Sequence, residues 1–222
     1  SIPVVEFAFY ILVCVTSLLG YIWGAESWLI AYPLPAAEYA RRVSRVDRLI
    51  NVRPAPIAVA VAIFLVVLVW KKFGWHDDTE GFPTYFLLEL ILVVAPAAML
   101  NAAVSPVINA PAFIFKTLTL VLTSLLWEAT LALPYGWWGY RHENMMGILV
   151  RPWYNLPIEA VLLWPSAAWM QITLYEALRI YLRSGRPLMN LLFHHRPPPV
   201  TAGGCVVPFT PPVASPSCVS LR

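Results

Sequence analysis

Long apolar runs make up most of the chain, and polar residues gather in the stretches between them. A helix that crosses about 30 Å of hydrocarbon needs roughly 20 predominantly apolar residues, so runs of this length predict membrane spans. Five segments meet the criterion: Ile2 to Trp23, Pro54 to Trp70, Pro83 to Val104, Pro106 to Leu133 and Leu156 to Leu182. The pattern predicts an all-α fold, a polytopic transmembrane helical bundle of about five spans.

Two further stretches do not fit a simple span. The segment from Ala25 to Ala37 is apolar but interrupted by Pro33 and Pro35, and we expect an interfacial or re-entrant piece there. The bundle is predicted to occupy residues 1–190, whereas residues 191–222 are rich in proline and predict a disordered cytoplasmic tail. The sequence enters an apolar run at Ser1 without a methionine, so we expect missing residues or a longer parent chain.

The composition supports a membrane protein and excludes one class of partner. Of the 222 residues, 59% are hydrophobic and only 12% are charged, well outside the range of a soluble domain. The chain has 15 Lys and Arg against 12 Asp and Glu, but these basic residues lie at helix ends instead of forming one patch. We therefore expect the lipid bilayer as a partner and no nucleic acid.

Basic residues near two connections predict the orientation, because loops rich in Lys and Arg stay in the cytoplasm. They are Arg41, Arg42, Arg45, Arg48 and Arg53 in the first connection, and Arg179, Arg183, Arg186 and Arg196 around the end of the last span. Five crossings then place the amino terminus outside and the carboxyl terminus in the cytoplasm.

Three glutamates lie inside apolar segments, where an ionisable side chain costs roughly 2.5 to 3.5 kcal/mol at a helix centre. Glu89 lies six positions after Pro83, Glu128 six before Pro134, and Glu159 three after Leu156. With a rise of about 1.5 Å per residue, each is within about 10 Å of the outer boundary. The sequence therefore predicts one layer of carboxyls, although it does not say whether they face one another.

A carboxylic acid kept neutral in a dry, apolar pocket is a proton donor, and such chemistry suits a polyene that lacks polar handles. We expect Glu128, Glu159 and Glu89 as catalytic candidates. Asn155 is a plausible cap of the last helix, which would put Glu159 in a first turn where its ionised form is favoured. Glu128 is then the better candidate acid and Glu159 a base or cation stabiliser, while the donor itself stays open.

Aromatic side chains around the same layer could stabilise a carbocation through their ring faces. The long connection from Pro134 to Asn155 is expected to fold over the bundle as a lid. The alternative is that Trp and Tyr simply collect at a membrane interface. The candidate substrate-binding residues are Trp127, Tyr135, Trp137, Trp138, Tyr140, Trp153, Asn155 and Trp164.

The run from Asn155 to Glu159, which follows a tryptophan-rich loop, resembles the LPIEE element of membrane-integral lycopene cyclases, the heterodimeric bacterial type also found fused in fungal enzymes. The resemblance covers about Trp127 to Glu176. Ala160 stands where that family has a second glutamate, which leaves open a different product or a lost activity. The pair Trp127 and Glu128 also resembles membrane-integral terpene cyclases, in which an intramembrane glutamate is thought to supply the proton.

Both resemblances imply that a proton starts the cyclisation of a carotenoid or other isoprenoid end group, with no cofactor, no metal and no net redox change. The substrate would be an apolar isoprenoid or carotenoid, and a partner subunit or a homo-oligomer would suit this activity.

Other functions are also compatible with the sequence. The residues from His76 to Glu80 after Lys71 and Lys72 superficially resemble a magnesium site for a diphosphate, but a solvated turn explains them better. A non-enzymatic lipid-binding, pigment-binding or transport subunit would use the glutamates as a proton relay or as hydrogen bonds between helices. Glu176, three positions before Arg179, is expected to form an intrahelical pair with a structural role.

Overall fold

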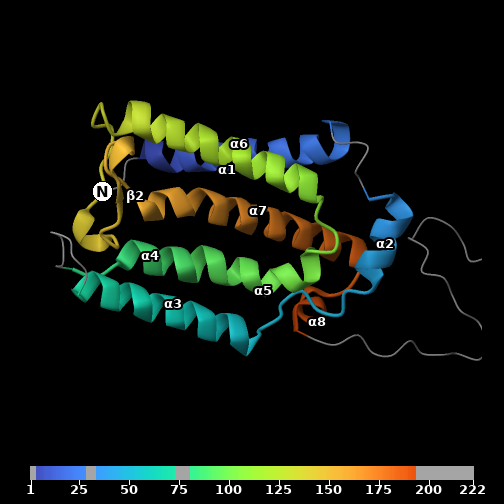
Figure 1. The fold of residues 1–222 in the computed structure, drawn as a ribbon. Coiled ribbons are helices and arrows are strands. Elements are labelled where there is room, and N and C mark those ends of the chain that lie inside the picture. Colours follow the sequence, from blue (N-terminus) through green and yellow to red (C-terminus); the bar gives the residue numbers. More distant parts are fainter. Residues whose placement is uncertain (1–3, 29–33, 74–80, 194–222) are drawn as a thin grey trace, which may run out of the picture.

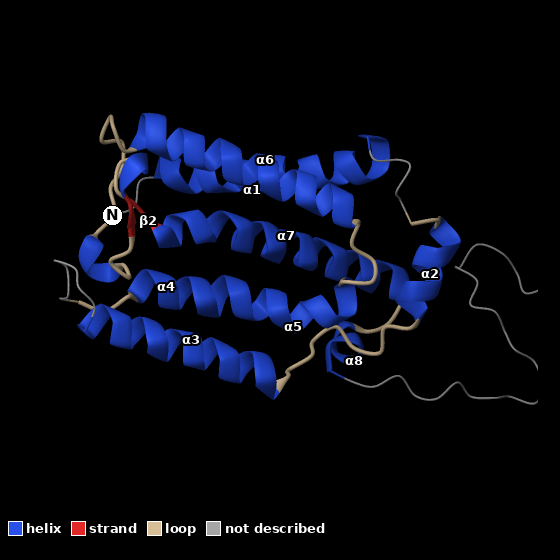
Figure 2. Ribbon diagram, in the orientation of Figure 1, coloured by secondary structure: helices blue, strands red, loops and turns tan. Residues whose placement is uncertain are grey.

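The computed structural model describes residues 4–28, 34–73 and 81–193, and its long helices lie roughly side by side (Figure 1). Figure 2 shows that helices make up nearly all of the described chain, so the all-α prediction is confirmed. The long helical stretches are α1 (Val4–Trp23) with η1 (Gly24–Trp28), α3 (Pro54–Phe73), α4 (Thr84–Glu89) with η2 (Leu90–Val94) and α5 (Ala95–Val104), α6 (Ala110–Trp127) with η3 (Glu128–Ala132), and α7 (Ile158–Ser184).

The shorter elements lie at the two ends of the bundle (Figure 1). At one end are α2 (Ala36–Ser44) and α8 (Leu188–Phe193). At the other end are the 3-10 turns η4 (His142–Asn144) and η5 (Arg151–Trp153) and the strands β1 (Leu149–Val150) and β2 (Leu156–Pro157). The two strands pair antiparallel, with Leu149 opposite Pro157 and Val150 opposite Leu156.

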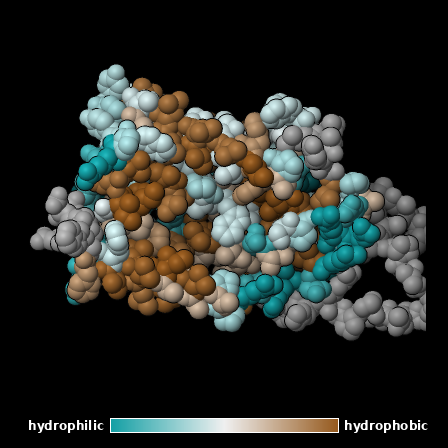
Figure 3. Space-filling model, viewed as in Figure 1, coloured by the Kyte–Doolittle hydropathy of each residue, from teal (hydrophilic) through white to brown (hydrophobic). Residues whose placement is uncertain are grey.

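Four helical stretches are long and apolar enough to cross a membrane: Tyr10–Trp28, Pro54–Phe73, Thr84–Val104 and Ala110–Ala132. Their outward side chains are apolar; Val66 is 68% exposed and Leu122 is 67% exposed. Figure 3 shows hydrophobic residues over the middle of this face and hydrophilic ones toward the end that carries α2. Because contiguous apolar surface of this extent is unfavourable in water, these findings support integration into a membrane.

The helix α7 is long but does not meet the same criterion of hydropathy. It makes its most extensive contacts with α6 and α5, and it also contacts α1, α2 and α4. Its buried residues include Trp164, Thr173 and Glu176 as well as small alanines. A helix enclosed by other helices can carry polar groups because those groups find partners within the protein. Because α7 exposes leucines such as Leu174 and Leu178 and buries its polar residues against its neighbours, it can have a lower hydropathy than the other long helices.

The structure corrects some predicted boundaries. The fourth long helix begins at Ala110 and not at Pro106, because the Asn109 side chain caps it by accepting from the Ala112 amide at 3.1 Å. The last long helix begins at Ile158, and the residue preceding it is Pro157, without a side-chain cap. The prediction that Asn155 caps this helix is therefore wrong.

Two other predictions are not confirmed over their full length. The expected re-entrant piece begins with η1, which continues α1 to Trp28; residues 29–33 lie outside the described part, and α2 follows from Ala36. The predicted disordered tail falls largely on residues 194–222, which are also outside the described part. Within residues 191–193, α8 continues to Phe193 and Leu191 is fully buried.

The carboxylate of Glu176 connects three helices at the end near α2. It is only 1% exposed, and it accepts hydrogen bonds from Tyr21 of α1 at 2.9 Å and Tyr39 of α2 at 3.3 Å. Arg179 donates to it at 2.9 Å, as the sequence predicted. Burial and the nearby Glu176 raise the pKa of Tyr39 to about 12, so this hydroxyl is a donor at neutral pH.

We expect Glu176→Ala to lower the stability by about 2 to 3 kcal/mol, because it leaves a half-buried guanidinium and two tyrosine hydroxyls without their acceptor. Thermal unfolding in detergent, followed by tryptophan fluorescence, measures the effect. Glu38→Ala is the control, since Glu38 pairs with Arg41 and Arg42 near the surface, and its smaller effect should disappear in high salt. Equal unfolding midpoints for wild type and Glu176→Ala would contradict this role.

Candidate functional site

The three glutamates predicted as catalytic candidates lie at the end of the bundle opposite α2. Glu89 is the last residue of α4, Glu128 the first of η3, and Glu159 lies in the first turn of α7. Their exposed fractions are 6%, 2% and 0%, so none of them reaches the surface. Tyr85 is close enough to all three to interact with them electrostatically. The three carboxyls therefore lie at the same end of the bundle, around Tyr85.

Glu128 is held at both of its oxygens. The indole N–H of Trp164 donates to Oε1 at 3.0 Å, and the hydroxyl of Tyr140 donates to Oε2 at 3.1 Å. Trp164 belongs to α7, whereas Tyr140 belongs to the connection after η3. The carboxyl of Glu128 thereby joins α6, α7 and the connecting loop.

Glu89 and Glu159 are each held at one oxygen only. Ser166 of α7 donates to Oε1 of Glu89 at 2.8 Å, and the backbone amide of Met146 donates to Oε1 of Glu159. The Oε2 atoms of both glutamates are buried without a hydrogen-bond partner in the part of the chain that the structure describes. A buried oxygen without a hydrogen bond costs free energy. A proton or a polar ligand that binds these two atoms would remove that cost.

A π-helical turn adjoins two of the three glutamates. The segment η2 follows Glu89 directly, and η3 begins at Glu128, whose carbonyl accepts from the Leu133 amide five residues later at 3.1 Å. Pro96 has no amide hydrogen to continue the helical ladder after η2. Such wide turns are frequent at functional sites because they change the direction of neighbouring side chains.

The connection between η3 and α7 closes this end of the bundle over the glutamates. The Nζ of Lys71, at the end of α3, donates to the carbonyls of Glu143 and Met145 and is only 2% exposed. Gly81 also lies against this loop, since a Cβ there would approach the Glu143 oxygen to 2.4 Å. Together with the hydrogen bond from Met146 to Glu159, these contacts fix the loop.

A cavity of about 330 Å³ lies between the loop and the helices beside Glu128. A cavity of this size is at the lower end of the range for small-molecule sites. Tyr85 meets Tyr140 edge to face on its wall, with ring centroids 6.5 Å apart. The lining residues are Tyr10, Thr84, Tyr85, Leu88, Glu128, Trp138, Gly139, Tyr140, Arg141, Asn144, Met145, Leu163 and Trp164.

The structure separates the aromatic residues that the sequence grouped together. Trp138, Tyr140 and Trp164 line the cavity beside Glu128, whereas Trp127 lines a second cavity on the other side of Trp164. The remaining candidates are exposed: Tyr135 by 70%, Trp137 by 56% and Trp153 by 41%, together with Asn155. Exposed aromatic residues at this level fit the alternative interpretation, an interfacial belt.

Several residues of the site were missed in the sequence. Tyr85 lies four positions before Glu89, so the helical period could have placed both on one face. Ser166 and Lys71 gave no such signal, because their partners come from helices and loops far away in the chain. Glu89 and Glu159 do not line the cavity themselves.

Among the described residues, no group of three or more His, Cys, Asp and Glu side chains is arranged to hold a metal ion. Comparison with protein-family models, curated proteins and solved structures finds no match to the chain. The resemblance to lycopene cyclases and terpene cyclases therefore stays a prediction that rests on the short motifs.

We expect Lys71→Met to loosen the loop, because the substitution removes a charged donor from two backbone carbonyls. Hydrogen exchange of the amides between residues 141 and 147 should accelerate by about tenfold or more, the equivalent of one lost charged hydrogen bond. Lys72→Met is the matched control, since the neighbouring Lys72 is exposed and faces the ring of Phe73. Unchanged exchange in Lys71→Met would show that other contacts hold the loop.

Proposed function

We propose that the protein is a membrane-embedded cyclase that acts on an isoprenoid end group, with a carotenoid as the first substrate class to test. The observation that carries this proposal is Glu128, a buried carboxyl that lines an aromatic cavity inside an apolar bundle. A substrate that consists only of carbon and hydrogen can enter such a cavity from the bilayer, and protonation is the chemistry that a carboxylic acid offers it.

The proposed reaction begins when a protonated carboxyl adds its proton to a terminal carbon–carbon double bond. The tertiary carbocation that forms is attacked by a neighbouring double bond of the same end group, which closes a ring and moves the positive charge. Loss of a proton from the ring then gives a new double bond and restores the carboxylic acid. One proton enters and one leaves, so the product is an isomer of unchanged mass.

In this proposal Glu128 transfers the proton, because it is the glutamate among the three that lines the cavity. Trp164 fixes one oxygen of the carboxyl, and Tyr140 contacts the other, so that the acid points in one direction. The rings of Tyr85 and Trp138 border the same space, and their electron-rich faces would stabilise the developing cation without trapping it as a covalent adduct.

Glu159 and Glu89 would act behind the cavity wall. Each has one buried oxygen without a partner, and the two are close enough to interact electrostatically. We assign them to the acceptance of the released proton and its return to Glu128. Tyr85 fits this assignment because it contacts the cavity and also interacts with all three glutamates.

The proposal includes α7 as a fifth span, with the glutamate layer near the outer face. The contacts of α7 with α1, α4, α5 and α6, together with its exposed leucines, support it. Charge supports the orientation: eight basic residues lie near the end with α2 and four near the glutamate end, and loops richer in Lys and Arg stay in the cytoplasm. The eight are Arg41, Arg42, Arg45, Arg48, Arg53, Arg179, Arg183 and Arg186, and the four are Lys71, Lys72, Arg141 and Arg151.

A second candidate function is a pigment-binding or lipid-binding subunit in which the glutamates only join helices. The hydrogen bonds from Trp164 to Glu128 and from Ser166 to Glu89 favour it, because both connect α7 to a neighbouring helix. In that case the same cavity would hold an apolar ligand without changing it.

The test is the pigment extract of a lycopene-accumulating bacterium that expresses the chain. We expect an isomer of lycopene with unchanged mass and shortened conjugation, detected by chromatography with absorption and mass spectra. Glu128→Gln and Glu159→Gln should each reduce the product by about a hundredfold or more, the usual contribution of acid and base groups. If lycopene is not converted, the assay is repeated with a C50 acyclic carotenoid and with an epoxidised prenyl substrate, which separates a wrong substrate from a lack of activity.

The matched control is Glu143→Gln, which removes a carboxyl from the exposed part of the loop and should convert lycopene as the wild type does. Glutamine keeps an oxygen that can accept from Trp164, and its NH2 group can donate to the hydroxyl oxygen of Tyr140, so Glu128→Gln should remain folded and membrane-inserted. Full turnover in Glu128→Gln would show that Glu128 does not transfer the proton, and bound but unchanged pigment in every assay would favour the binding subunit.

A further inference from the structure

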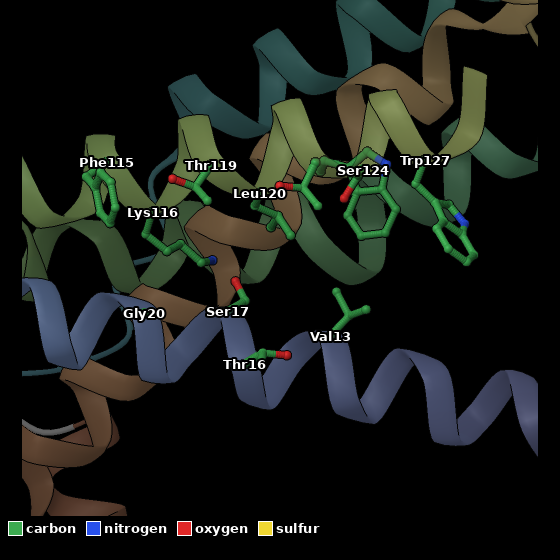
Figure 4. A pocket seen from close by; sticks show the side chains of 12 residues that line it. Val13, Thr16, Ser17, Gly20, Phe115, Lys116, Thr119, Leu120, Ser124 and Trp127 are labelled. Atoms are coloured by element: carbon green, nitrogen blue, oxygen red, sulfur yellow. The ribbon is translucent and has the colours of Figure 1, made fainter. Parts of the chain in front are cut away.

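A second cavity, of about 380 Å³, lies between α1 and α6 and contains a buried lysine (Figure 4). Its walls carry apolar side chains such as Val13 and Leu120 together with small hydroxyl residues. In Figure 4 the side chain of Lys116 extends from α6 toward Ser17 of α1, into the space between the two helices. Trp127 closes the far end of the cavity.

Within the described part of the chain, no acidic residue forms an ion pair with Lys116. The side chain is only 3% exposed, and it donates one hydrogen bond, at 3.2 Å, to the amide oxygen of Gln171. Among residues 4–28, 34–73 and 81–193, the ion pairs are those of Glu38 and Glu176, and Lys116 belongs to neither. A buried ammonium in apolar surroundings needs an anion or must lose its proton.

A second polar group in the same cavity has no partner. The hydroxyl of Ser17 is buried without a hydrogen bond to any described residue, and the Lys116 side chain extends toward it in Figure 4. Thr16 is different, because its hydroxyl already donates to the Leu12 carbonyl. Lys116 and Ser17 thus offer a cation and a hydroxyl to one ligand group, and the rest of the wall offers apolar contact.

The cavity extends along the helices from this polar pair toward the tryptophan. Lys116 and Trp127 are 11 residues apart on α6 (127 − 116), which is about 16 Å along the axis. Lys116 is six residues from Ala110 (116 − 110), or about 9 Å from the end of α6 nearest α2. A single extended chain with one negative headgroup fits this shape and this charge.

We propose that the groove between α1 and α6 binds a long-chain carboxylic acid, with its carboxylate on Lys116 and Ser17 and its chain running toward Trp127. One cation and one free hydroxyl match a singly charged carboxylate, whereas a phosphate or diphosphate carries more charge than these two groups balance. This site is separate from the proposed cyclase cavity, although Trp164 lines both.

Gly20 offers a way to fill the groove without a clash. It lines the cavity, and a Cβ built at this position meets no atom within 4 Å. In Figure 4 Gly20 lies on the side of Lys116 away from Trp127, so a leucine there would fill the end of the groove where the carboxylate would lie. Leu19, the preceding residue on α1, is 56% exposed and does not line the cavity, so Leu19→Phe adds bulk outside it.

The experiment measures binding of radiolabelled palmitate to the full chain, purified and delipidated in an uncharged detergent. We expect saturation at one palmitate per chain, and methyl palmitate should compete about tenfold less well or worse, because the ester lacks the charge. Lys116→Met should lower palmitate affinity by about tenfold or more and leave methyl palmitate unaffected, whereas Lys116→Arg should retain the preference for the acid.

Gly20→Leu should abolish binding of both compounds, and Leu19→Phe should bind as the wild type does. Ser17→Ala removes only a hydroxyl and should weaken the binding of palmitate but not that of methyl palmitate. If Lys116→Met does not elute as a monodisperse species, Ser17→Ala still tests the proposal. Equal competition by acid and ester in the wild type, or unchanged palmitate binding in Lys116→Met or Ser17→Ala, would overturn the proposal. Equal competition would instead indicate a groove for hydrocarbon chains.

Discussion

Ionisable and polar side chains inside an apolar bundle must find their partners in the protein, because lipid tails offer none. In this chain the helix α7 supplies most of those partners. It carries one buried glutamate in its first turn and another toward its carboxyl end, and it provides a donor or acceptor to four other helices. The contacts are Trp164 to Glu128, Ser166 to Glu89, Gln171 to Lys116, and Glu176 to Tyr21 and Tyr39.

This role explains why α7 is the long helix with the lowest hydropathy and why it lies among the others. A lipid-facing helix with the same residues would expose them to hydrocarbon, at a cost of several kcal/mol for each charge. Placed between α5 and α6, the same residues are satisfied and hold the bundle together. The polar positions that make α7 a poor span by composition are therefore the ones that specify its neighbours.

Trp164 connects the two cavities physically. Its indole N–H contacts Glu128 on one side, and the residue lines both the glutamate cavity and the groove between α1 and α6. It also packs in a small apolar cluster with Leu125, Leu156 and Ala160. Because such packing holds the indole in one orientation, an occupant of either cavity meets the same fixed wall.

The depth of the glutamates could be calculated from the sequence, but their surroundings could not. A helix has a constant rise per residue, so counting from the helix ends predicted that Glu89, Glu128 and Glu159 lie at the same depth in the bundle. The direction of each side chain depends on how the helices are rotated, and rotation is set by packing. For this reason the sequence grouped Trp137 with Tyr140, although the structure exposes the first and hydrogen-bonds the second to Glu128.

By itself, the sequence determined that the chain is a bundle of apolar helices with a layer of carboxyls near one end, because hydropathy and helical rise are local properties. Tertiary structure alone decided that Asn155 lies exposed and not at a helix cap, that Lys71 binds the loop, and that Lys116 faces a groove. These features depend on contacts between segments far apart in the chain, and no local pattern encodes which groups will meet.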